Sequence, residues 1–298
     1  MLQTDQMNHF NSLLPGQTGE EGPSRRTALK TALGVGYAAT VGAAIAQTAI
    51  KTPSEGLTTG EISVEVNGFK VPAYRAAPAG KTNLPVVLVI QEIFGVHEYI
   101  ADVTRRWAKL GYLAIAADLY ARQGDASQYG EISKLMSELV SKVPDAQVAG
   151  DLDGVVRWAA ANGGDVSRMG VTGFCWGGRQ TWLYAAHGPV KAAVAFYGPL
   201  LAPPDSLRPQ SPLDIVGSLK APVLGLYGAA DQGIPLDVVE KMKAALAGGN
   251  AAAKASQIVV YEGAPHGFHA DYRPSYRKEA AEDGWKRAQA WFKANGVA

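Results

Sequence analysis

The sequence of 298 residues has very little cysteine: the only thiol belongs to Cys175. A single thiol excludes an internal disulfide and a metal cluster held by several thiolates. The five histidines lack the HExxH type of spacing, so we expect neither a structural metal nor a cofactor. A large excess of charge of one sign is also lacking, because the 28 basic and 27 acidic side chains give a net charge of only +1. The interspersed signs give no basic stripe, which argues against nucleic-acid binding.

The N-terminal segment differs in composition from the remainder. Arg25 and Arg26 precede a weakly apolar run at residues 31–46, which is too short and too rich in glycine for a stable membrane span. Such a pair is typical of leaders that direct folded bacterial proteins to the twin-arginine (Tat) export machinery, and residues 44–46 supply a small-residue cleavage signal. We expect residues 1–50 to be this leader and the protein to be periplasmic. The alternative is an N-terminal extension of a cytoplasmic protein.

Residues 51–298 have the pattern of one α/β domain. Short β-branched runs alternate with longer amphipathic stretches, which indicates a mostly parallel, doubly wound sheet flanked by helices. We expect strands at residues 62–66, 71–75, 86–90, 113–116, 168–172, 192–196, 223–227 and 257–261. We expect helices at residues 100–109, 129–139, 145–161, 176–186, 236–247 and 275–295. In such a fold the chemistry lies at the carboxyl ends of the strands.

Cys175 lies at the centre of Gly173-Phe174-Cys175-Trp176-Gly177-Gly178, directly after an expected strand. Glycines on both sides of a nucleophile suit the tight strand-to-helix turn called a nucleophile elbow, in which the central residue has a strained backbone. A lone cysteine is usually just a small buried hydrophobic residue. This context instead predicts a nucleophile exposed at the top of the sheet.

An acid and a base follow in the order that this turn requires. Asp231 comes after the expected strand 223–227, and His266 comes after the strand 257–261. Taken singly, Asp231 would be a helix cap and His266 a loop histidine. Taken together with Cys175, they predict a triad in which Asp231 accepts the Nδ1 proton of His266 and Nε2 faces the sulfur. His97, His187 and His269 have no comparable positional argument.

Glu92 directly follows the most apolar strand, where a charged group has to be solvated, paired or functional. It either pairs with a nearby arginine or contacts the Cys175 thiol and helps to control its ionisation. The same loop predicts an oxyanion hole made by the backbone N–H groups of Ile93 and Trp176. Arg122, after the strand 113–116, either pairs with Glu92 or binds an anionic substrate.

With these residues in place, the chain resembles the dienelactone hydrolase family (carboxymethylenebutenolidases) of the α/β-hydrolase fold. The matching segments are Gln91-Glu92-Ile93-Phe94-Gly95-Val96, Asp118-Leu119-Tyr120-Ala121-Arg122, the segment around Cys175, Gly228-Ala229-Ala230-Asp231 and His266-Gly267-Phe268.

The resemblance implies roles for individual residues. Cys175 is the nucleophile, His266 and Asp231 are its partners, and Glu92 takes the thiol proton when substrate arrives. Arg122 binds the substrate carboxylate, and we add its neighbour Tyr120 to the substrate-binding set. The second carboxylate-binding arginine of the family is replaced here by Ala270, and we expect Arg273 to substitute for it.

The chemistry of sulfur narrows the expected substrates. A thiolate leaves a tetrahedral intermediate more readily than an alkoxide, so the other group must also depart easily, as an enolate does. We therefore expect a hydrolase that opens lactones or activated esters through a thioester on Cys175. The alternatives are a generic carboxylesterase or thioesterase with the same triad, and a hydrolase-like domain that only binds a ligand. The sequence leaves the oligomeric state open.

Overall fold

The computed structural model describes residues 49–298. The expected leader, with Arg25, Arg26 and the cleavage signal at residues 44–46, lies outside the described residues.

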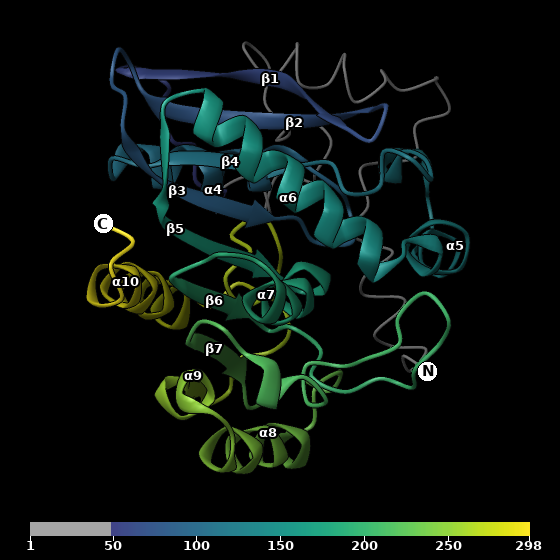
Figure 1. Ribbon diagram of the computed structural model, residues 1–298. Helices are drawn as coiled ribbons and strands as arrows, with labels where there is room; N and C mark the ends of the chain where they lie inside the picture. The colour runs from purple at the N-terminus through teal and green to yellow at the C-terminus, as the bar shows by residue number, and fades with distance from the viewer. Residues whose placement is uncertain (1–48) are drawn as a thin grey trace.

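One mixed sheet organises the described chain, with eight strands in the order β1-β2-β4-β3-β5-β6-β7-β8 (Figure 1). The strands are β1 Leu57–Val66, β2 Phe69–Pro78, β3 Leu84–Ile90, β4 Leu113–Ala117, β5 Gly164–Phe174, β6 Ala192–Phe196, β7 Val223–Gly228 and β8 Gln257–Tyr261. The pairs β1–β2 and β2–β4 are antiparallel, and every other neighbouring pair is parallel. The expected α/β class and mostly parallel sheet are confirmed.

The local sequence explains both the edge and the centre of this sheet. Asn67 and Gly68 have φ of +50° and +79°, the backbone that a two-residue hairpin turn requires, and they join β1 to β2. In contrast, β4 is buried along its whole length and β3 along most of it. Helices cover both faces of these parallel strands, which is why their sequences are almost wholly apolar.

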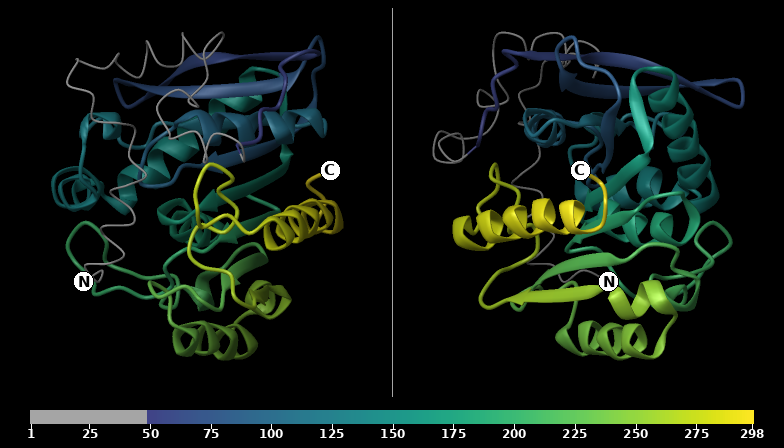
Figure 2. Two further views of the ribbon diagram at one scale, coloured as in Figure 1. Left: turned by 180° about the vertical axis from the view of Figure 1, so that it is seen from behind. Right: turned by 60° about the vertical axis from the view of Figure 1, so that its left-hand side comes forward.

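The helices form two layers around the sheet. The α-helices of four or more residues are α4 Glu98–Lys109, α6 Asp145–Ala161, α7 Trp176–His187, α8 Leu236–Gly248, α9 Ala251–Ala255 and α10 Lys278–Ala294. Figure 1 shows α6 and α7 on the near face, and the left view of Figure 2 shows α10 in front of the opposite face. Trp107 of α4 and Trp285 of α10 have ring centroids 4.5 Å apart, so these two helices pack on one another. None of the helices within residues 49–298 combines the length and apolar character needed to cross a bilayer.

One expectation about helices is wrong, and one helix was not expected. The segment expected as one helix at residues 129–139 begins with extended backbone at Tyr129 and Glu131. Its helix α5 therefore starts only at Ile132, spans Ile132–Lys134 and continues as a π turn over Leu135–Leu139. The short helix α9 was not expected, although Asn250 caps it by accepting a hydrogen bond from the Ala253 N–H at 2.9 Å.

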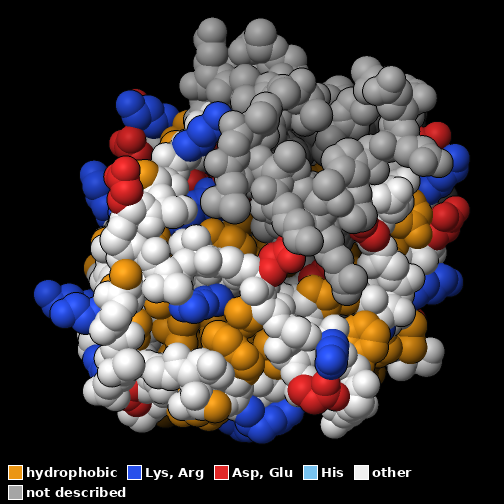
Figure 3. Space-filling view, turned by 90° about the horizontal axis from the view of Figure 1, so that it is seen from above, with side chains coloured by type: hydrophobic (Ala, Val, Ile, Leu, Met, Phe, Trp, Pro, Cys, Tyr) orange, Lys and Arg blue, Asp and Glu red, His pale blue; other side chains and the backbone are white. Residues whose placement is uncertain are grey.

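The surface seen from the hairpin side carries charges of both signs. In Figure 3, the Lys and Arg side chains of the described residues are interspersed with Asp and Glu, and hydrophobic side chains lie between them. The part of this face that Figure 3 leaves uncovered therefore carries no field of a single sign.

The beginning of the described chain is fastened to α4. The N–H and hydroxyl of Thr52 donate to Asp102 at 2.5 and 3.1 Å, and the N–H of Ile50 donates to Asp271 at 3.2 Å. Arg106 joins the two carboxylates, at 2.6 Å from each. Residues at the start of the domain are thereby linked to the loop that follows β8.

Candidate active site

Cys175 occupies the turn between β5 and α7, with φ of +56° and ψ of −119°. This positive φ is unusual for a residue with a side chain and marks local strain. Close packing holds the turn, because a Cβ added to Gly173 would lie 2.2 Å from the carbonyl oxygen of Gly177. A Cβ on Gly177 would lie 2.4 Å from the carbonyl oxygen of Gln91, in the loop after β3. The glycines thus bring the half-buried Cys175 next to the segment that contains Glu92 and Ile93.

The structure brings Asp231 and His266 to the same site. Asp231 follows β7 and His266 follows β8, and Nδ1 of His266 lies 2.7 Å from Oδ2 of Asp231. The other oxygen of Asp231 accepts a hydrogen bond from the Gly233 N–H at 2.8 Å. Asp231 is not the cap of α8, whose N-cap residue is Pro235. His266 also has a side-chain hydrogen bond with Cys175, so the three predicted catalytic residues form a connected row.

The surroundings of His266 favour its charged form. Burial lowers the pKa of the imidazole, but the negative charge of Asp231, the sulfur of Cys175 and the hydrogen bonds to both outweigh it. The pKa of His266 is consequently well above its ordinary value. An imidazolium beside the sulfur stabilises a thiolate, as does the positive end of the α7 dipole that begins at Trp176.

The two backbone N–H groups predicted as an oxyanion hole are available. Ile93 lies in the tight turn closed by the bridge between Glu92 and Gly95, and Trp176 is the first residue of α7. Among the described residues, neither N–H has a hydrogen-bond acceptor in the chain. Two unpaired donors beside a nucleophile suit an acyl oxygen that develops negative charge.

Glu92 is fully buried and is held by three side chains. Tyr272 donates its hydroxyl at 2.8 Å, Arg273 Nη2 lies at 3.4 Å, and Nε2 of His97 lies at 3.4 Å. Burial raises the pKa of Glu92, but Arg273, His97 and Tyr272 outweigh it and lower that pKa to about 2. Of the two alternatives for Glu92, the structure shows the pairing with an arginine. Within the described residues, its contacts do not include Cys175.

The arginine that pairs with Glu92 is Arg273, so the first of the two alternatives for Arg122 is wrong. Arg122 binds the carboxylate of Asp151 in α6 and donates to the carbonyl oxygen of Val66 at 3.3 Å. Its guanidinium also lies 4.5 Å from the ring centroid of Phe69, because the hairpin β1–β2 and α6 enclose it. A substrate-binding role for Arg122 stays a prediction.

The other two predicted substrate-binding residues lie closer to the nucleophile. Tyr120 is fully buried, and its ring packs edge-on against Trp176 at 4.9 Å. Arg273 is buried at 4.9 Å from the ring centroid of Phe94. Burial lowers the pKa of Arg273, but electrostatic interactions with Glu92, Tyr272 and Cys175 outweigh burial and raise that pKa. The guanidinium is therefore within electrostatic reach of the sulfur. Substrate contact by either residue is still a prediction.

Several residues of the site were missed in the sequence. Tyr197 is buried against His266, with ring centroids 5.1 Å apart, and it has the unusual φ of +38°. Its position directly after the strand 192–196 was the available signal. His97 and Tyr272 hold Glu92, but no local pattern marks residues that meet only in the folded chain.

His269, for which the sequence offered no role, has a structural place in the core. Its Nδ1 lies 2.7 Å from the Tyr99 hydroxyl. Burial and the nearby Arg106 lower the pKa of His269 to about 3. His269 is therefore neutral near pH 7.

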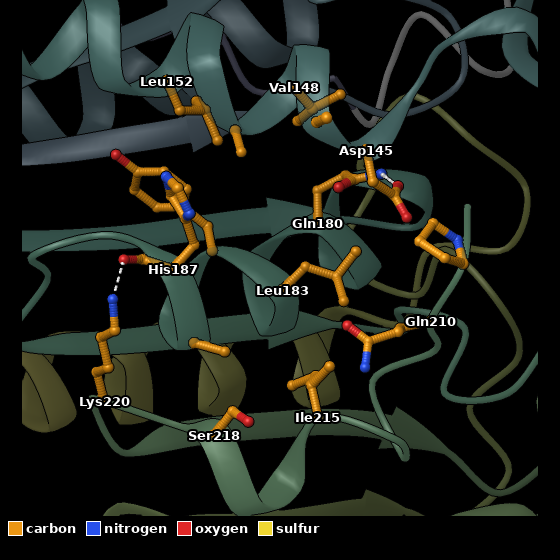
Figure 4. Close-up of a pocket in the computed structure, with 15 residues that line it drawn as sticks. Asp145, Val148, Leu152, Gln180, Leu183, His187, Gln210, Ile215, Ser218 and Lys220 are labelled. Atoms are coloured by element: carbon orange, nitrogen blue, oxygen red, sulfur yellow. Dashed lines mark hydrogen bonds between the residues drawn. The ribbon is translucent and has the colours of Figure 1, made fainter. Parts of the chain in front are cut away.

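A separate cavity of about 330 Å³ lies between α6, α7 and residues 209–220 (Figure 4). Val148, Leu152, Leu183 and Ile215 give it apolar walls, and Lys220 donates a hydrogen bond to the carbonyl oxygen of His187 at 2.6 Å at one end. The predicted catalytic triad does not contribute to its lining.

Known proteins match nearly the whole chain. The sequence model of the Dienelactone hydrolase family matches residues 71–296. A protein of Methylorubrum extorquens named "Putative carboxymethylenebutenolidase" is 54% identical over 98% of this chain and 100% of its own length. A protein of the same name from Escherichia coli K12 is 52% identical over 85% of this chain and 93% of its own length.

A solved structure matches the fold as well as the sequence. The crystal structure described as a "Putative Dienelactone Hydrolase" from Klebsiella pneumoniae has a TM-score of 0.77 and 56% sequence identity. That match covers 80% of this chain and 98% of the other chain. Together with the family match, it confirms the resemblance drawn from the sequence motifs. The chain belongs to the dienelactone hydrolase family and is a hydrolase of the α/β-hydrolase fold.

Proposed function

We propose that the protein hydrolyses lactones and activated esters through a thioester on Cys175. The observation that carries this proposal is the row of three groups in which His266 contacts Asp231 at 2.7 Å and is hydrogen-bonded to Cys175. Such a row provides a nucleophile, a group that exchanges protons with it, and a carboxylate that orients this group.

In the first half of the cycle, the Cys175 thiolate attacks the carbonyl carbon of the substrate. The carbonyl electron pair moves onto oxygen, which accepts hydrogen bonds from the N–H groups of Ile93 and Trp176. When the pair returns, the bond from carbon to the ester oxygen breaks, and the His266 imidazolium donates its proton to the departing oxygen. The product is a thioester on Cys175 and an alcohol, or an enol where the ester was an enol lactone.

In the second half, the neutral His266 removes a proton from water as the water oxygen attacks the thioester. Collapse of the second tetrahedral intermediate breaks the carbon–sulfur bond and releases the acid, which restores the thiolate and the imidazolium. His266 already contacts the sulfur and can perform both transfers. The implied role of Glu92 as the acceptor of the thiol proton requires it to leave Tyr272, His97 and Arg273, and it stays a prediction.

A substrate panel tests the proposal. We expect purified protein to hydrolyse a p-nitrophenyl ester and an enol lactone, and to leave the matched p-nitroanilide nearly untouched. Titration with iodoacetamide should remove activity with one equivalent bound, because the chain has one thiol. The variant Cys175→Ala should be inactive, and Asp237→Asn, an exposed change on α8, should be fully active. Faster turnover of the anilide than of the ester, or activity that survives full alkylation, would refute the proposal.

We further propose that residues 1–46 direct export of the folded enzyme, on the basis of Arg25, Arg26 and the apolar run that follows them. The double change of Arg25→Lys and Arg26→Lys should retain the full-length protein in the cytoplasm. N-terminal sequencing of periplasmic material should find a start near Gln47. An intact Met1 on active periplasmic protein would contradict cleavage.

A further inference from the structure

The strand β8 forms one edge of the sheet, because β7 is its only neighbour in the strand order. Every residue of β7 is buried, whereas no residue of β8 is fully buried. Ile258, Val259 and Val260 are apolar but only half-buried. The described chain therefore leaves part of this apolar strand uncovered.

The outer side of β8 presents backbone groups without partners. The carbonyl oxygen of Tyr261 accepts a hydrogen bond at 2.9 Å from the N–H of Ala229, which follows β7, so this oxygen points towards β7. Because backbone groups alternate in direction along a strand, the N–H and C=O groups of Ile258 and Val260 point away from β7. Among the described residues, these groups have no hydrogen-bond partner. Such an edge is a template for another strand.

The opposite edge strand, β1, is protected against pairing with itself. It carries the exposed Glu61 and Glu65, and two copies paired antiparallel about Ser63 would place Glu61 of one opposite Glu65 of the other. Like charges directly opposite one another repel. The five residues of β8 include no charged residue, proline or glycine, and its register with β7 has no bulge. The usual protection of an edge is thus present in β1 and missing in β8.

The charges that flank β8 fit a second copy of the same strand. Lys254 lies shortly before β8 and Glu262 directly after it, and both are exposed. Within residues 49–298, neither side chain has an ion-pair partner. Antiparallel pairing places the start of one strand beside the end of the other, so Lys254 of each copy comes near Glu262 of the other. A parallel arrangement would bring like charges together.

We propose that β8 pairs antiparallel with β8 of a second copy of this chain, about a two-fold axis at Val259, so that the two eight-stranded sheets become continuous. Ile258 of each copy then lies opposite Val260 of the other, and each such pair exchanges both of its hydrogen bonds. Val259 meets its own counterpart with Cα atoms about 4.5 Å apart, the spacing of a pair without hydrogen bonds. The same patch serves both copies, as a two-fold axis requires. The pairing does not depend on the proposed hydrolysis.

Sedimentation velocity of the full-length protein tests whether the dimer forms. We expect a species of twice the chain mass to dominate at about 100 μM, because the interface is short but combines apolar contacts with backbone hydrogen bonds. Val259→Lys places two like charges opposite one another at the axis and should be monomeric at the same concentration. Asp237→Asn, the exposed change on α8, should dimerise as the wild type does. A monomeric wild type, or a folded Val259→Lys that still dimerises, would overturn the proposal.

A disulfide tests the register of the two strands. In a Cys175→Ala background the chain has no other thiol. Val259→Cys should form a linked dimer in air with copper–phenanthroline, because a Cα separation of about 4.5 Å lies within the range of a disulfide. Gln257→Cys should link far more slowly, since the two copies of this residue would lie about 13 Å apart along the strands. Linking of Val259→Cys no faster than that of Gln257→Cys would overturn the proposed pairing.

Exchange of the flanking charges tests the antiparallel direction. Lys254→Glu and Glu262→Lys should each raise the dissociation constant of the dimer at least about threefold, because each places like charges together twice in the dimer. The double variant restores opposite charges and should return the dissociation constant to that of the wild type. A double variant that dimerises no better than either single variant would exclude the antiparallel arrangement.

Discussion

Backbone strain in the site is concentrated in two residues that carry side chains. Cys175 has a φ of +56° at the end of β5, and Tyr197 has a φ of +38° at the end of β6. The strands are neighbours, and the N–H of Cys175 donates to the carbonyl oxygen of Phe196 at 3.0 Å. Such conformations persist only where the surrounding structure holds them, and they are common at catalytic sites. The sheet and the packed glycines hold them here.

The pair of Asp231 and His266 provides a direct test of the predicted triad. Asp231→Asn replaces a hydrogen-bond acceptor with an amide whose N–H₂ competes for the same Nδ1 position, which disfavours the required tautomer of His266. We expect kcat for a p-nitrophenyl ester to fall about 10³- to 10⁴-fold. Far-ultraviolet circular dichroism and the reactivity of the Cys175 thiol would show whether the variant is folded. Activity within tenfold of the wild type would exclude the predicted role of Asp231.

The buried charge of Glu92 predicts a specific dependence of stability on pH. Its pKa is lowered from an ordinary value near 4.5 to about 2, so the ionised form stabilises the fold fully above pH 4.5. This contribution is lost as the pH falls from 4.5 towards 2, because the unfolded chain binds the proton first.

The comparison of wild type with Glu92→Gln measures this contribution. The difference in their free energies of unfolding in urea should shrink by about 2 kcal/mol between pH 5 and pH 3. The exposed control Glu240→Gln should show no such change. A difference that stays constant over this range would mean that Glu92 is not held as an anion.

At the scale of elements, the site depends on how closely α7 approaches the sheet. The carbonyl oxygens of Ile90 and Gln91 lie 2.5 and 2.4 Å from where a Cβ on Gly177 would be. Both are backbone atoms, so they can yield only if β3 and α7 separate.

Gly177→Ala should consequently lower the free energy of unfolding by at least about 2 kcal/mol, as measured with urea. The matched control is Gly150→Ala, in the middle of α6, where an added Cβ meets nothing within 4 Å. That change should raise stability by about 0.5 to 1 kcal/mol, because alanine favours the helix over glycine. Equal effects of the two substitutions would contradict the close-packing argument.

The elements predicted best from the sequence were those with a strong local signal. The strands β6 and β8 and the helix α6 have the expected bounds. The two strands are short apolar runs, and α6 lies directly between Pro144 and Asn162. The segment 129–139 was mispredicted, because its apolar spacing is helical while its backbone is extended at Tyr129 and Glu131. Periodicity identifies which residues are buried, but it does not show where the chain must extend to connect two elements.

At the scale of the whole molecule, a polar network joins the start of the domain to the loop behind the site. Asp102 of α4 is buried and binds Thr52, Arg105 and Arg106. Arg106 continues to Asp271, one residue before the Tyr272 that holds Glu92.

Asp102→Ala should lower the free energy of unfolding by about 3 kcal/mol, because it removes one of the two carboxylates that each of Arg105 and Arg106 contacts and the partner of Thr52. The control Asp205→Ala breaks an exposed pair with Arg208 and should leave the urea midpoint unchanged. Hydrogen exchange should show faster opening of residues 50–56 in Asp102→Ala only. A loss of stability similar to that of the control would show that the network does not fasten the chain start.

The sequence by itself determined the class of fold and the identity of the predicted triad. Hydrophobic runs define the strands, and a nucleophile, an acid and a base that each follow a strand must meet at one edge of a parallel sheet. The role of the elbow glycines around Cys175 could also be predicted from the sequence, because a tight turn needs small residues at positions that are adjacent in the chain.

Only the tertiary structure decided how the charges are paired. Glu92 and Arg273 are far apart in the sequence, and their contact depends on how the loop after β8 folds back over the loop after β3. The same is true of Arg122, which the β1–β2 hairpin and α6 commit to Asp151. Ion pairs are made between whichever opposite charges the fold encloses together, so their partners follow from packing over long sequence distances.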